Sequence, residues 1–163
     1  MEIRKSSPKD IDRLMEIFAH AREYMALNGN PYQWGHNGWP KKEVIENDIN
    51  KGVSYVVLNE NKIVGTFVYK YGEEIDPCYK KIYEGSWKYD GPYGVIHRIA
   101  VIEHGLGVLP FVVSWAKEDN RHIRIDTYKD NAIMIHILEK LGFVYRGIIY
   151  VEHDLEPRLA YEI

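Results

Sequence analysis

The feature that most constrains this sequence is a strand–helix–strand pattern in its second half. Residues 93–101 and 122–126 are predicted as strands, and a helix is expected at 108–118 with Pro110 in its first turn. Two strands joined through a helix lie parallel in one sheet, with a right-handed crossover. A parallel pair is therefore expected near the centre of the sheet.

The remaining elements are predicted from capping, periodicity and turn signals. Ser7 can cap a helix, Pro8 suits its first position, and Asp10 can close a capping box. Apolar residues then follow at spacings of three and four, as expected for one helix face. The other expected elements are a strand at 2–6, a first helix that starts at Pro8 and continues past Met25, helices at 41–51 and 131–141, a hairpin of strands at 54–58 and 62–71, a short helix near Lys80, and strands at 143–151 and 158–163.

Length and composition fit one globular domain. The 163 residues are 45% hydrophobic and 28% charged, which argues against wholesale disorder. The net charge of −3 is a poor basis for nucleic-acid binding, which depends on an excess of Lys and Arg. The single cysteine, Cys78, excludes an intrachain disulfide and fits a reducing compartment. With neither a signal peptide nor a long apolar run, we expect a cytoplasmic protein with no membrane partner.

Two glycines stand between the first strand and the helix of the central pattern, in Gly105-Leu106-Gly107. Glycines there let backbone N–H groups approach a ligand, and the helix N-terminus adds partial positive charge. Both features favour a phosphate or pyrophosphate, although a tight turn without a ligand is an open alternative. The segment is not a dinucleotide fingerprint, because Pro110 stands where the third glycine would fall.

The ordered set of motifs resembles the GNAT superfamily of acyl-CoA-dependent N-acyltransferases over nearly the whole chain. Its most specific parts are the strand end Ile99-Ala100-Val101 and the helix from Asn131 to Leu141-Gly142-Phe143. The hairpin with Lys62-Ile63-Val64-Gly65 matches the family's first half. The resemblance implies a single GNAT-type domain over 1–163. Its α/β fold would have a mixed sheet of about seven strands, antiparallel in the N-terminal part and with a splayed parallel pair at the centre, flanked by about four helices.

The resemblance also implies acetyl-CoA as co-substrate. In this family the pantetheine runs along the strand that matches 93–101, where a splayed strand exposes unpaired backbone groups that an extended ligand can satisfy. The pyrophosphate is held by amides of the loop that follows. The cofactor-binding residues implied here are Ile99, Ala100, Val101, Gly105, Leu106, Gly107, Val108 and Asn131.

Two departures from the family pattern concern binding and proton transfer. Ile102 stands where the family loop usually opens with a basic residue or Gln, so Arg98 and Lys117 are the nearest permanent cations. Leu138 occupies the position of a tyrosine that protonates the departing thiolate in many members. Tyr128, Tyr145 and Tyr150 are weak substitutes for that acid, and a thiolate can also leave unaided.

His97 is the candidate general base. An alkylamine arrives mostly protonated at pH 7 and must lose a proton before it attacks a thioester. His97 alternates with Val95 and Ile99 on one face of the predicted strand, and an imidazole suits proton transfer at neutral pH. Some aralkylamine acetyltransferases of the superfamily place a histidine at the matching position. The Ile99 N–H, or a neighbour, would stabilise the oxyanion. A structural histidine bonded across the sheet is the alternative for His97.

Aromatic residues gather in and just before the loop at 31–40 and in the segment 79–93. Both segments match the walls of the acceptor site in the family. Aromatic faces favour a cation or a flat apolar group, and nearby acidic residues also suit an amine. Ordinary loop packing is the alternative, since the chain holds 13 tyrosines. The substrate-binding candidates are Tyr32, Trp34, Trp39 and Trp87.

Other chemistry finds little support in the sequence. Cys78 lacks a neighbouring histidine, so an acyl-enzyme on its thiol is disfavoured. The histidines lack metal-ligand spacing, so no metal site is expected. The charged runs Lys41-Lys42-Glu43 and Glu46-Asn47-Asp48 are interpreted as solvated helix faces.

The sequence thus favours an N-acetyltransferase that moves an acetyl or short acyl group from acyl-CoA to a primary amine of a small molecule or peptide. Direct transfer in a ternary complex is expected. A catalytically weakened acyl-CoA or small-ligand binding module is the alternative, favoured by the short loop and by Leu138. A protein-interaction domain is a third possibility. A homodimer through the β-rich C-terminal end stays open.

Overall fold

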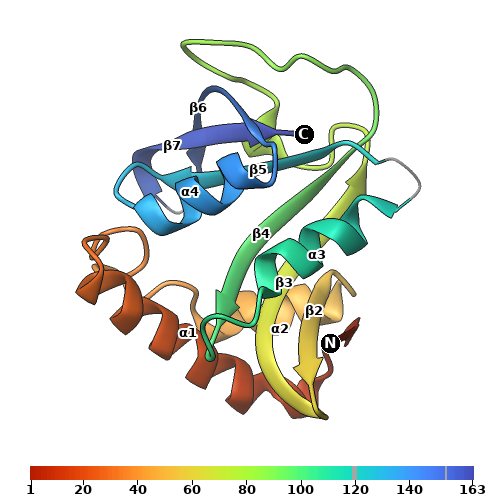
Figure 1. Ribbon diagram of the computed structural model, residues 1–163, viewed down its shortest axis with the longest axis vertical. Coiled ribbons are helices and arrows are strands. Elements are labelled where there is room, and N and C mark those ends of the chain that lie inside the picture. Colours follow the sequence, from red (N-terminus) through yellow and green to blue (C-terminus); the bar gives the residue numbers. More distant parts are fainter. Residues whose placement is uncertain (119–120, 153) are drawn as a thin grey trace. The chain divides into compact units, whose positions relative to one another are not determined.

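The computed structural model describes residues 1–118, 121–152 and 154–163. Over these residues the strands and helices follow the order predicted from the sequence (Figure 1). The strands are β1 Glu2–Lys5, β2 Ser54–Asn59, β3 Lys62–Gly72, β4 Tyr93–Val101, β5 Ile123–Tyr128, β6 Val144–Val151 and β7 Asp154–Glu162; the helices are α1 Ile11–Leu27, α2 Lys42–Asn50, α3 Val108–Ala116 and α4 Ala132–Lys140.

The described strands form one seven-stranded mixed sheet in the order β1-β2-β3-β4-β5-β7-β6. The β4–β5 pair is parallel, with Gly94 opposite Ile123 and Val95 opposite Arg124. The β1–β2, β2–β3, β5–β7 and β6–β7 pairs are antiparallel. The predicted α/β fold with a central parallel pair is confirmed. The short helix expected near Lys80 is a single 3₁₀ turn at Pro77–Tyr79.

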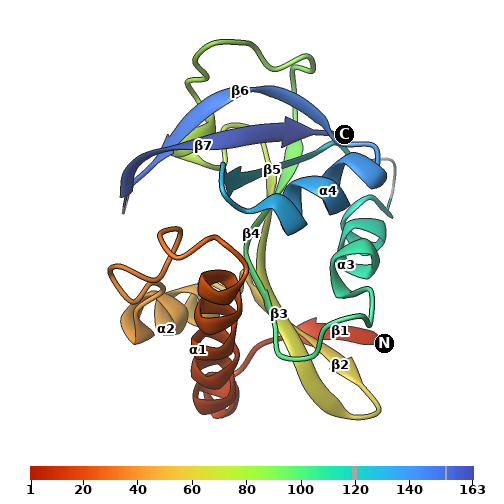
Figure 2. The ribbon, with the colours of Figure 1, turned by 60° about the vertical axis from the view of Figure 1, so that its left-hand side comes forward.

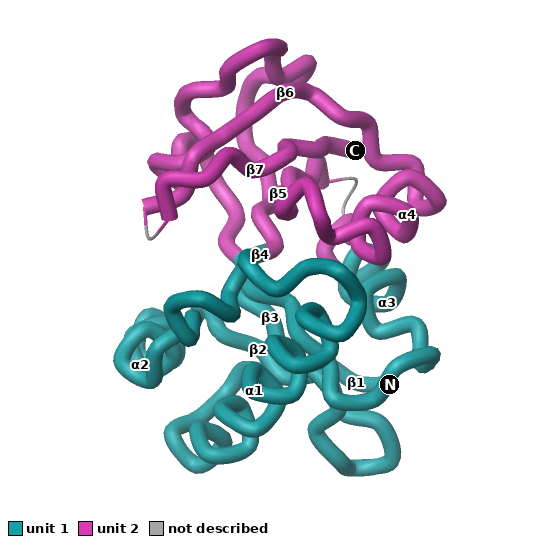
Figure 3. The backbone as a smooth tube through the Cα atoms, turned by 90° about the vertical axis from the view of Figure 1, so that its left-hand side faces the viewer, with its two compact units in different colours: residues 1–69, 97–115 teal, residues 70–96, 116–163 magenta. Residues whose placement is uncertain are grey.

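The chain divides into two compact units (Figure 3). Unit 1 comprises residues 1–69 and 97–115, and unit 2 comprises residues 70–96 and 116–163. Strands β3 and β4 each contribute residues to both units. The second half of β4, the loop that follows it and most of α3 therefore belong to unit 1.

Unit 1 packs helices on both faces of its strands (Figure 2). Leu14 and Ile17 of α1 and Ile45 of α2 form one buried cluster with Val56 of β2. The neighbouring residue Tyr55 points to the opposite face, because side chains alternate along a strand. There it packs with Phe67 against Trp115 of α3.

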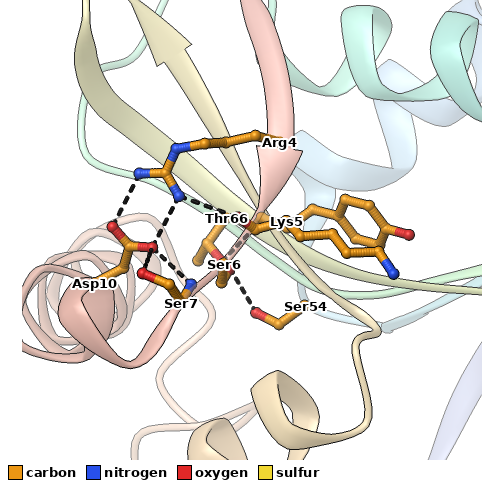
Figure 4. Close-up of polar contacts among 8 residues, drawn as sticks. Arg4, Lys5, Ser6, Ser7, Asp10, Ser54 and Thr66 are labelled. Atoms are coloured by element: carbon orange, nitrogen blue, oxygen red, sulfur yellow. Dashed lines mark hydrogen bonds and ion pairs between the residues drawn. The ribbon is translucent and has the colours of Figure 1, made fainter.

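The predicted capping box of Ser7 and Asp10 is present, but Pro8–Asp10 form a 3₁₀ turn and α1 begins only at Ile11 (Figure 4). The Asp10 carboxylate accepts hydrogen bonds from the Ser7 N–H at 2.7 Å and the Ser7 hydroxyl at 3.0 Å. Arg4 of β1 donates two further bonds to Asp10, both at 2.9 Å. The hydrogen bond from Arg4 is the largest cause that lowers the Asp10 pKa to about 2. The contact thus joins β1 to the first turn before α1.

In unit 2, the irregular segment between β3 and β4 is held against β6. Tyr83 and Ile148 exchange two backbone hydrogen bonds of 2.8 Å each. Gly147 permits this approach, since a Cβ there would lie 2.5 Å from the Tyr83 carbonyl oxygen. Its φ of 149° also belongs to the region that favours glycine. A segment with no repeating secondary structure is therefore anchored by main-chain bonds.

Across the described ranges, none of the helices combines the length and apolar character needed to cross a membrane.

Candidate active site

The regular β conformation of strand β4 is interrupted at Arg98, and we call this interruption the strand break. This residue has a φ of 49°, in the left-handed region that residues with a Cβ seldom adopt. It lies between His97 and Ile99, the candidate base and the first residue of the candidate pantetheine strand. The expectation that His97 and Ile99 share one face depends on regular alternation. The left-handed residue between them interrupts that alternation.

Arg98 is paired with an acidic side chain of α2. Its Nε and Nη2 atoms donate to Asp48 Oδ2 at 3.0 and 2.7 Å. Asp48 is 6% exposed, so the interpretation of the run Glu46-Asn47-Asp48 as a solvated helix face was wrong for this residue. Its position three residues after the buried Ile45 places it on the inward side of α2. The Arg98 guanidinium therefore pairs with Asp48 within unit 1, and it does not serve as a free cation for a phosphate.

The candidate phosphate loop leaves β4 at Ile102, whose N–H donates to the Val64 carbonyl at 3.0 Å. Gly105 and Gly107 have φ values of 87° and 72°, both left-handed. A Cβ built on either glycine would meet no atom of the described residues within 4 Å. The glycines thus serve the turn of the backbone and leave open space around it, as a loop that receives a ligand requires.

Helix α3 begins directly after this loop. Its first backbone bond runs from the Phe111 N–H to the Gly107 carbonyl at 3.1 Å. The N–H groups of Val108 and Leu109 precede that bond, so they have no partner inside the helix. With the partial positive charge of the helix end, they supply donors suited to an anion. No Lys or Arg occurs from Ile102 to Val108. The fit to a pyrophosphate therefore depends on amides and the helix end.

A second feature of the loop is a stack of aromatic rings against α1. The His104 ring lies on that of Tyr24, with centroids 3.6 Å apart and planes at 18°. His20 lies beside His104 at 5.5 Å, and its Nε2 atom is buried with no hydrogen-bond partner among the residues that the structure describes. Burial, with a smaller contribution from His20, lowers the pKa of His104. The stack ties the loop before Gly105 to α1.

His97 itself is half-buried in β4, one residue before the break. It is the first residue of β4 that belongs to unit 1, since the preceding residues of the strand belong to unit 2. Ile99 and Val101 are half-buried, while Ala100 is 4% exposed and packs in the cluster with α1 and α2. The roles of these residues stay predictions.

The three acceptor-side candidates of unit 1 differ in exposure. Tyr32 is 60% exposed. Trp34 is 8% exposed and packs edge-on against Phe18, with ring centroids 5.8 Å apart. Trp39 is half-buried against the same cluster, and Arg22 donates to its carbonyl at 3.2 Å. Of these three side chains, Tyr32 is thus the most accessible to a ligand. Trp34 anchors the loop to α1 through its contact with Phe18.

Two candidates lie in unit 2, where each has a described structural role. Asn131 is the N-cap of α4, and its side-chain oxygen accepts from the Met134 N–H at 3.2 Å. Trp87 donates from Nε1 to the Tyr79 carbonyl at 2.9 Å and stacks on the Tyr79 ring. Contacts of either residue with a substrate stay predictions.

The candidates for proton donation and nucleophilic attack also lie in unit 2. Tyr128 is 5% exposed beneath the Arg158 guanidinium, whereas Tyr145 and Tyr150 are 46% and 47% exposed on β6. Leu138, at the position of the family's acid, is fully buried. Burial first, then Asp76, raises the pKa of Cys78 to about 11. A thiol with that pKa is mostly protonated at neutral pH and is a poor nucleophile.

Sequence reasoning missed Asp48 and the stacked His104. The signal for Asp48 was available, because its helical spacing from Ile45 matches the buried face. The stack of His104 on Tyr24 joins positions far apart in the chain and had no local signal. Within the described ranges, no group of three or more His, Cys, Asp or Glu side chains could hold a metal ion.

Comparison with known proteins places this fold. A GNAT-family acetyltransferase from Streptococcus agalactiae 2603 superposes with a TM-score of 0.85 at 30% identity, over 99% of this chain and 93% of that one. A GNAT-family acetyltransferase from Listeria monocytogenes 4b F2365 gives a TM-score of 0.70 at 16% identity, over 99% and 93%. The ribosomal-protein-alanine N-acetyltransferase of Brucella melitensis gives 0.62 at 17% identity, over 100% and 99%. Neither a protein-family profile nor a curated protein sequence matches the chain.

The α/β fold with its mixed seven-stranded sheet is the fold that this chain shares with these acetyltransferases. On the strength of the streptococcal structure, the chain belongs to the GNAT family of acetyltransferases.

Proposed function

We propose that this protein transfers an acetyl or short acyl group from acyl-CoA to a primary amine of a small molecule or peptide. Transfer is direct, within a ternary complex of protein, acyl-CoA and amine. The observation that carries the proposal is the open glycine loop, with its two left-handed glycines and the α3 N-terminus directly behind it. The resemblance to acetyltransferases supports the class of reaction.

Different residues of unit 1 bind the different parts of acyl-CoA. Backbone groups of Ile99, Ala100 and Val101 bind the pantetheine as an added strand does. The amides of Gly105, Leu106, Gly107 and Val108 bind the pyrophosphate. Acetyl-CoA supplies an activated thioester. Asn131, the N-cap of α4, contacts the pantetheine or the acceptor in this proposal.

His97 accepts the proton that the amine must lose, directly or through water. The amine nitrogen then forms a bond to the acyl carbon while the bond from that carbon to sulfur breaks. The Ile99 N–H, or a neighbouring one, donates to the acyl oxygen as negative charge develops there. The nitrogen loses its second proton as the amide forms. The departing thiolate takes up that proton, or leaves as the anion while the proton passes to solvent, since thiols have a pKa near ~8.5. The products are an amide and free CoA.

A binding module without catalysis is the second candidate. It is favoured by the absence of Lys and Arg from Ile102 to Val108, by the engagement of Arg98 with Asp48, and by Leu138 at the acid position. Such a module would bind acyl-CoA and transfer nothing. The two candidates therefore differ in turnover, not in affinity.

Calorimetric titration with acetyl-CoA, and with CoA as the comparison ligand, tests the binding step. Gly105→Ala should weaken binding, because the substitution disturbs a left-handed loop residue. Gly29→Ala is the matched control. Gly29 has a φ of 85°, against 87° for Gly105, and both have open surroundings. Equal backbone strain with unequal affinity would support the loop as the binding site. No binding of either ligand to the wild type contradicts the proposal.

Turnover tests the chemical step. CoA release is followed with a panel of primary amines: a polyamine, an aralkylamine and a peptide that begins with alanine, the last chosen from the similarity to the Brucella enzyme. His97→Ala should lower kcat by about 10²–10⁴-fold, the usual contribution of a general base, with little change in acetyl-CoA affinity. Binding without transfer to any amine would favour the binding module.

A further inference from the structure

We propose that Asp48 is a positioning residue for acyl transfer, acting through its ion pair with Arg98. The pair holds the left-handed break of β4 between His97 and Ile99. This inference rests on the proposed function, because it assigns Asp48 to the same site. It concerns a residue that has no role in the chemistry itself.

The backbone at Arg98 needs a stabilising contact. A φ of 49° lies in the left-handed region, which is unfavourable for residues that carry a Cβ. Such residues persist where surrounding structure fixes them, and they cluster at functional sites. Arg98 lies inside a strand, where neither a turn nor a helix end accounts for the conformation.

Asp48 supplies that contact from a buried position in α2. Both described bonds of Arg98 converge on Asp48 Oδ2, at 3.0 and 2.7 Å. The side chains of Asp48 and Arg98 are 9% and 18% exposed, so water screens the pair little. Asp48 lies near the end of α2, where its carbonyl accepts from the Val53 N–H at 3.1 Å and the adjacent Ile49 is buried.

The consequence concerns the residues on either side of Arg98. A break of this kind interrupts the regular pattern of a strand and re-aims its neighbours, and breaks are frequent beside active sites. Here those neighbours are the proposed base and the proposed N–H donor to the acyl oxygen. If Arg98 relaxed to an ordinary β conformation, the side chain of His97 and the amide of Ile99 would turn relative to one another. Catalysis depends on such alignment more steeply than binding does.

The test compares Asp48→Ala with Asp10→Ala. Asp10 is also a buried carboxylate of unit 1, 8% exposed and bonded twice to an arginine, Arg4 (Figure 4). Asp48→Ala should lower kcat by about tenfold or more, since small misplacements cost up to ~10²-fold. Its KM for acetyl-CoA should change much less than kcat, because the loop amides and the backbone of Ala100 and Val101 still bind the co-substrate. Asp10→Ala should leave kcat within about twofold.

Rescue by glycine separates positioning from general stabilisation. Glycine adopts a left-handed φ without the Cβ penalty, so it needs no ion pair to hold it there. The double variant Asp48→Ala/Arg98→Gly should therefore recover kcat by about threefold or more over Asp48→Ala alone. A role limited to stability predicts no recovery. If the double variant is no faster than the single variant, the inference is wrong.

The remaining outcomes are distinguishable. If Asp48→Ala does not fold, Asp48→Asn keeps the side-chain shape and is compared with Asp10→Asn in the same way. Equal kcat values for the Asp48 and Asp10 variants, with an active wild type, would overturn the role of Asp48 and leave the proposed function intact. A wild type that transfers no acyl group overturns the proposed function, and the role of Asp48 falls with it.

Discussion

Two buried carboxylates, Asp48 in unit 1 and Glu162 in unit 2, are both paired with arginine but differ in what they join. Glu162 is 0% exposed and contacts several separate parts of unit 2. Its Oε1 accepts from Arg146 Nε at 2.8 Å and from the Lys88 N–H at 2.7 Å. Its Oε2 lies 2.9 Å from His122 Nε2. One carboxylate therefore binds the irregular segment before β4, the region just before β5, and β6.

The bonds of the Asp48 side chain instead converge on one residue with an unusual backbone. A carboxylate that joins many segments stabilises the fold as a whole. A carboxylate that holds one strained residue determines local geometry, here beside the candidate base. Burial alone does not distinguish these roles, whereas the number and nature of the partners do.

Glu162→Gln gives the largest effect and tests the structural half of this comparison. The substitution keeps the shape but leaves Arg124 and Arg146 without their buried counter-charge. We expect a loss of about 3–5 kcal/mol in the free energy of unfolding, the usual cost of breaking a buried ion pair from one side. Urea denaturation at pH 7 measures it.

Glu156→Gln is the control for that measurement. Glu156 is exposed in the same strand, β7, so its substitution should change stability by less than about 0.5 kcal/mol. If Glu162→Gln costs no more than Glu156→Gln, the network around Glu162 does not stabilise unit 2, and the contrast with Asp48 loses its structural side.

Asp10→Ala should have an intermediate effect, with a defined pH dependence. The Asp10 pKa is lowered to about 2 from 3.8, chiefly by the hydrogen bond from Arg4. Arg4 is partly exposed, so we expect about 1–2 kcal/mol of stabilisation rather than the full value of the shift. A lowered pKa means that this stabilisation is present above pH 3.8 and is lost as pH falls toward 2.

Urea denaturation of wild type and Asp10→Ala at pH 7, 5, 4 and 3 measures that dependence. The difference in free energy between them should be constant down to about pH 5 and then shrink. A difference that grows below pH 4 would show that the contact of Asp10 with Arg4 is not the source of its contribution. The result also calibrates Asp10 as the control for Asp48.

The sequence predicted the elements of the fold because their signals are local. The strand–helix–strand pattern from 93 to 126 predicted the parallel pair of β4 and β5, and Ser7 with Asp10 predicted a capping box, which is present at the 3₁₀ turn before α1. The two loop glycines predicted a turn, and both have left-handed φ values. Each of these depends on residues near one another in the chain.

The ion pairs and the strand break could not be predicted in the same way. Arg98 and Asp48 are 50 positions apart, and the hydrogen bond from the Lys88 backbone N–H to Glu162 spans 74 positions. A left-handed arginine also lacks the glycine that would mark such a position in a sequence. The regular alternation assumed for His97 and Ile99 was therefore the natural expectation from the sequence, and a contact from α2 accompanies its interruption.

Asn131 in unit 2 offers a smaller test of the same distinction between fold and site. It caps α4 and is also a predicted contact of acyl-CoA. Asn131→Ala should cost about 1 kcal/mol of stability through loss of the cap. Asn131→Asp keeps a capping oxygen and should restore that stability. If acetyl-CoA binds Asn131→Asp as tightly as the wild type, the residue serves the fold alone.

His104 in unit 1 gives the smallest effect, and its sign follows from the lowered pKa of its ring. Burial and the nearby His20 lower the pKa of His104 in the folded state, so the unfolded chain binds the proton more readily. Stability contributed by the neutral ring is present above the ordinary histidine range and is lost as pH falls through it. His104→Gln should therefore lose less thermal stability between pH 8 and pH 5.5 than the wild type does.

Melting temperatures at the two pH values measure this, with His36→Gln, an exposed histidine of the same unit, as the control. A wild type that is stabilised by acid relative to His104→Gln would show that protonation strengthens the contact of His104 with Tyr24, and the stack would then hold the loop more firmly at low pH.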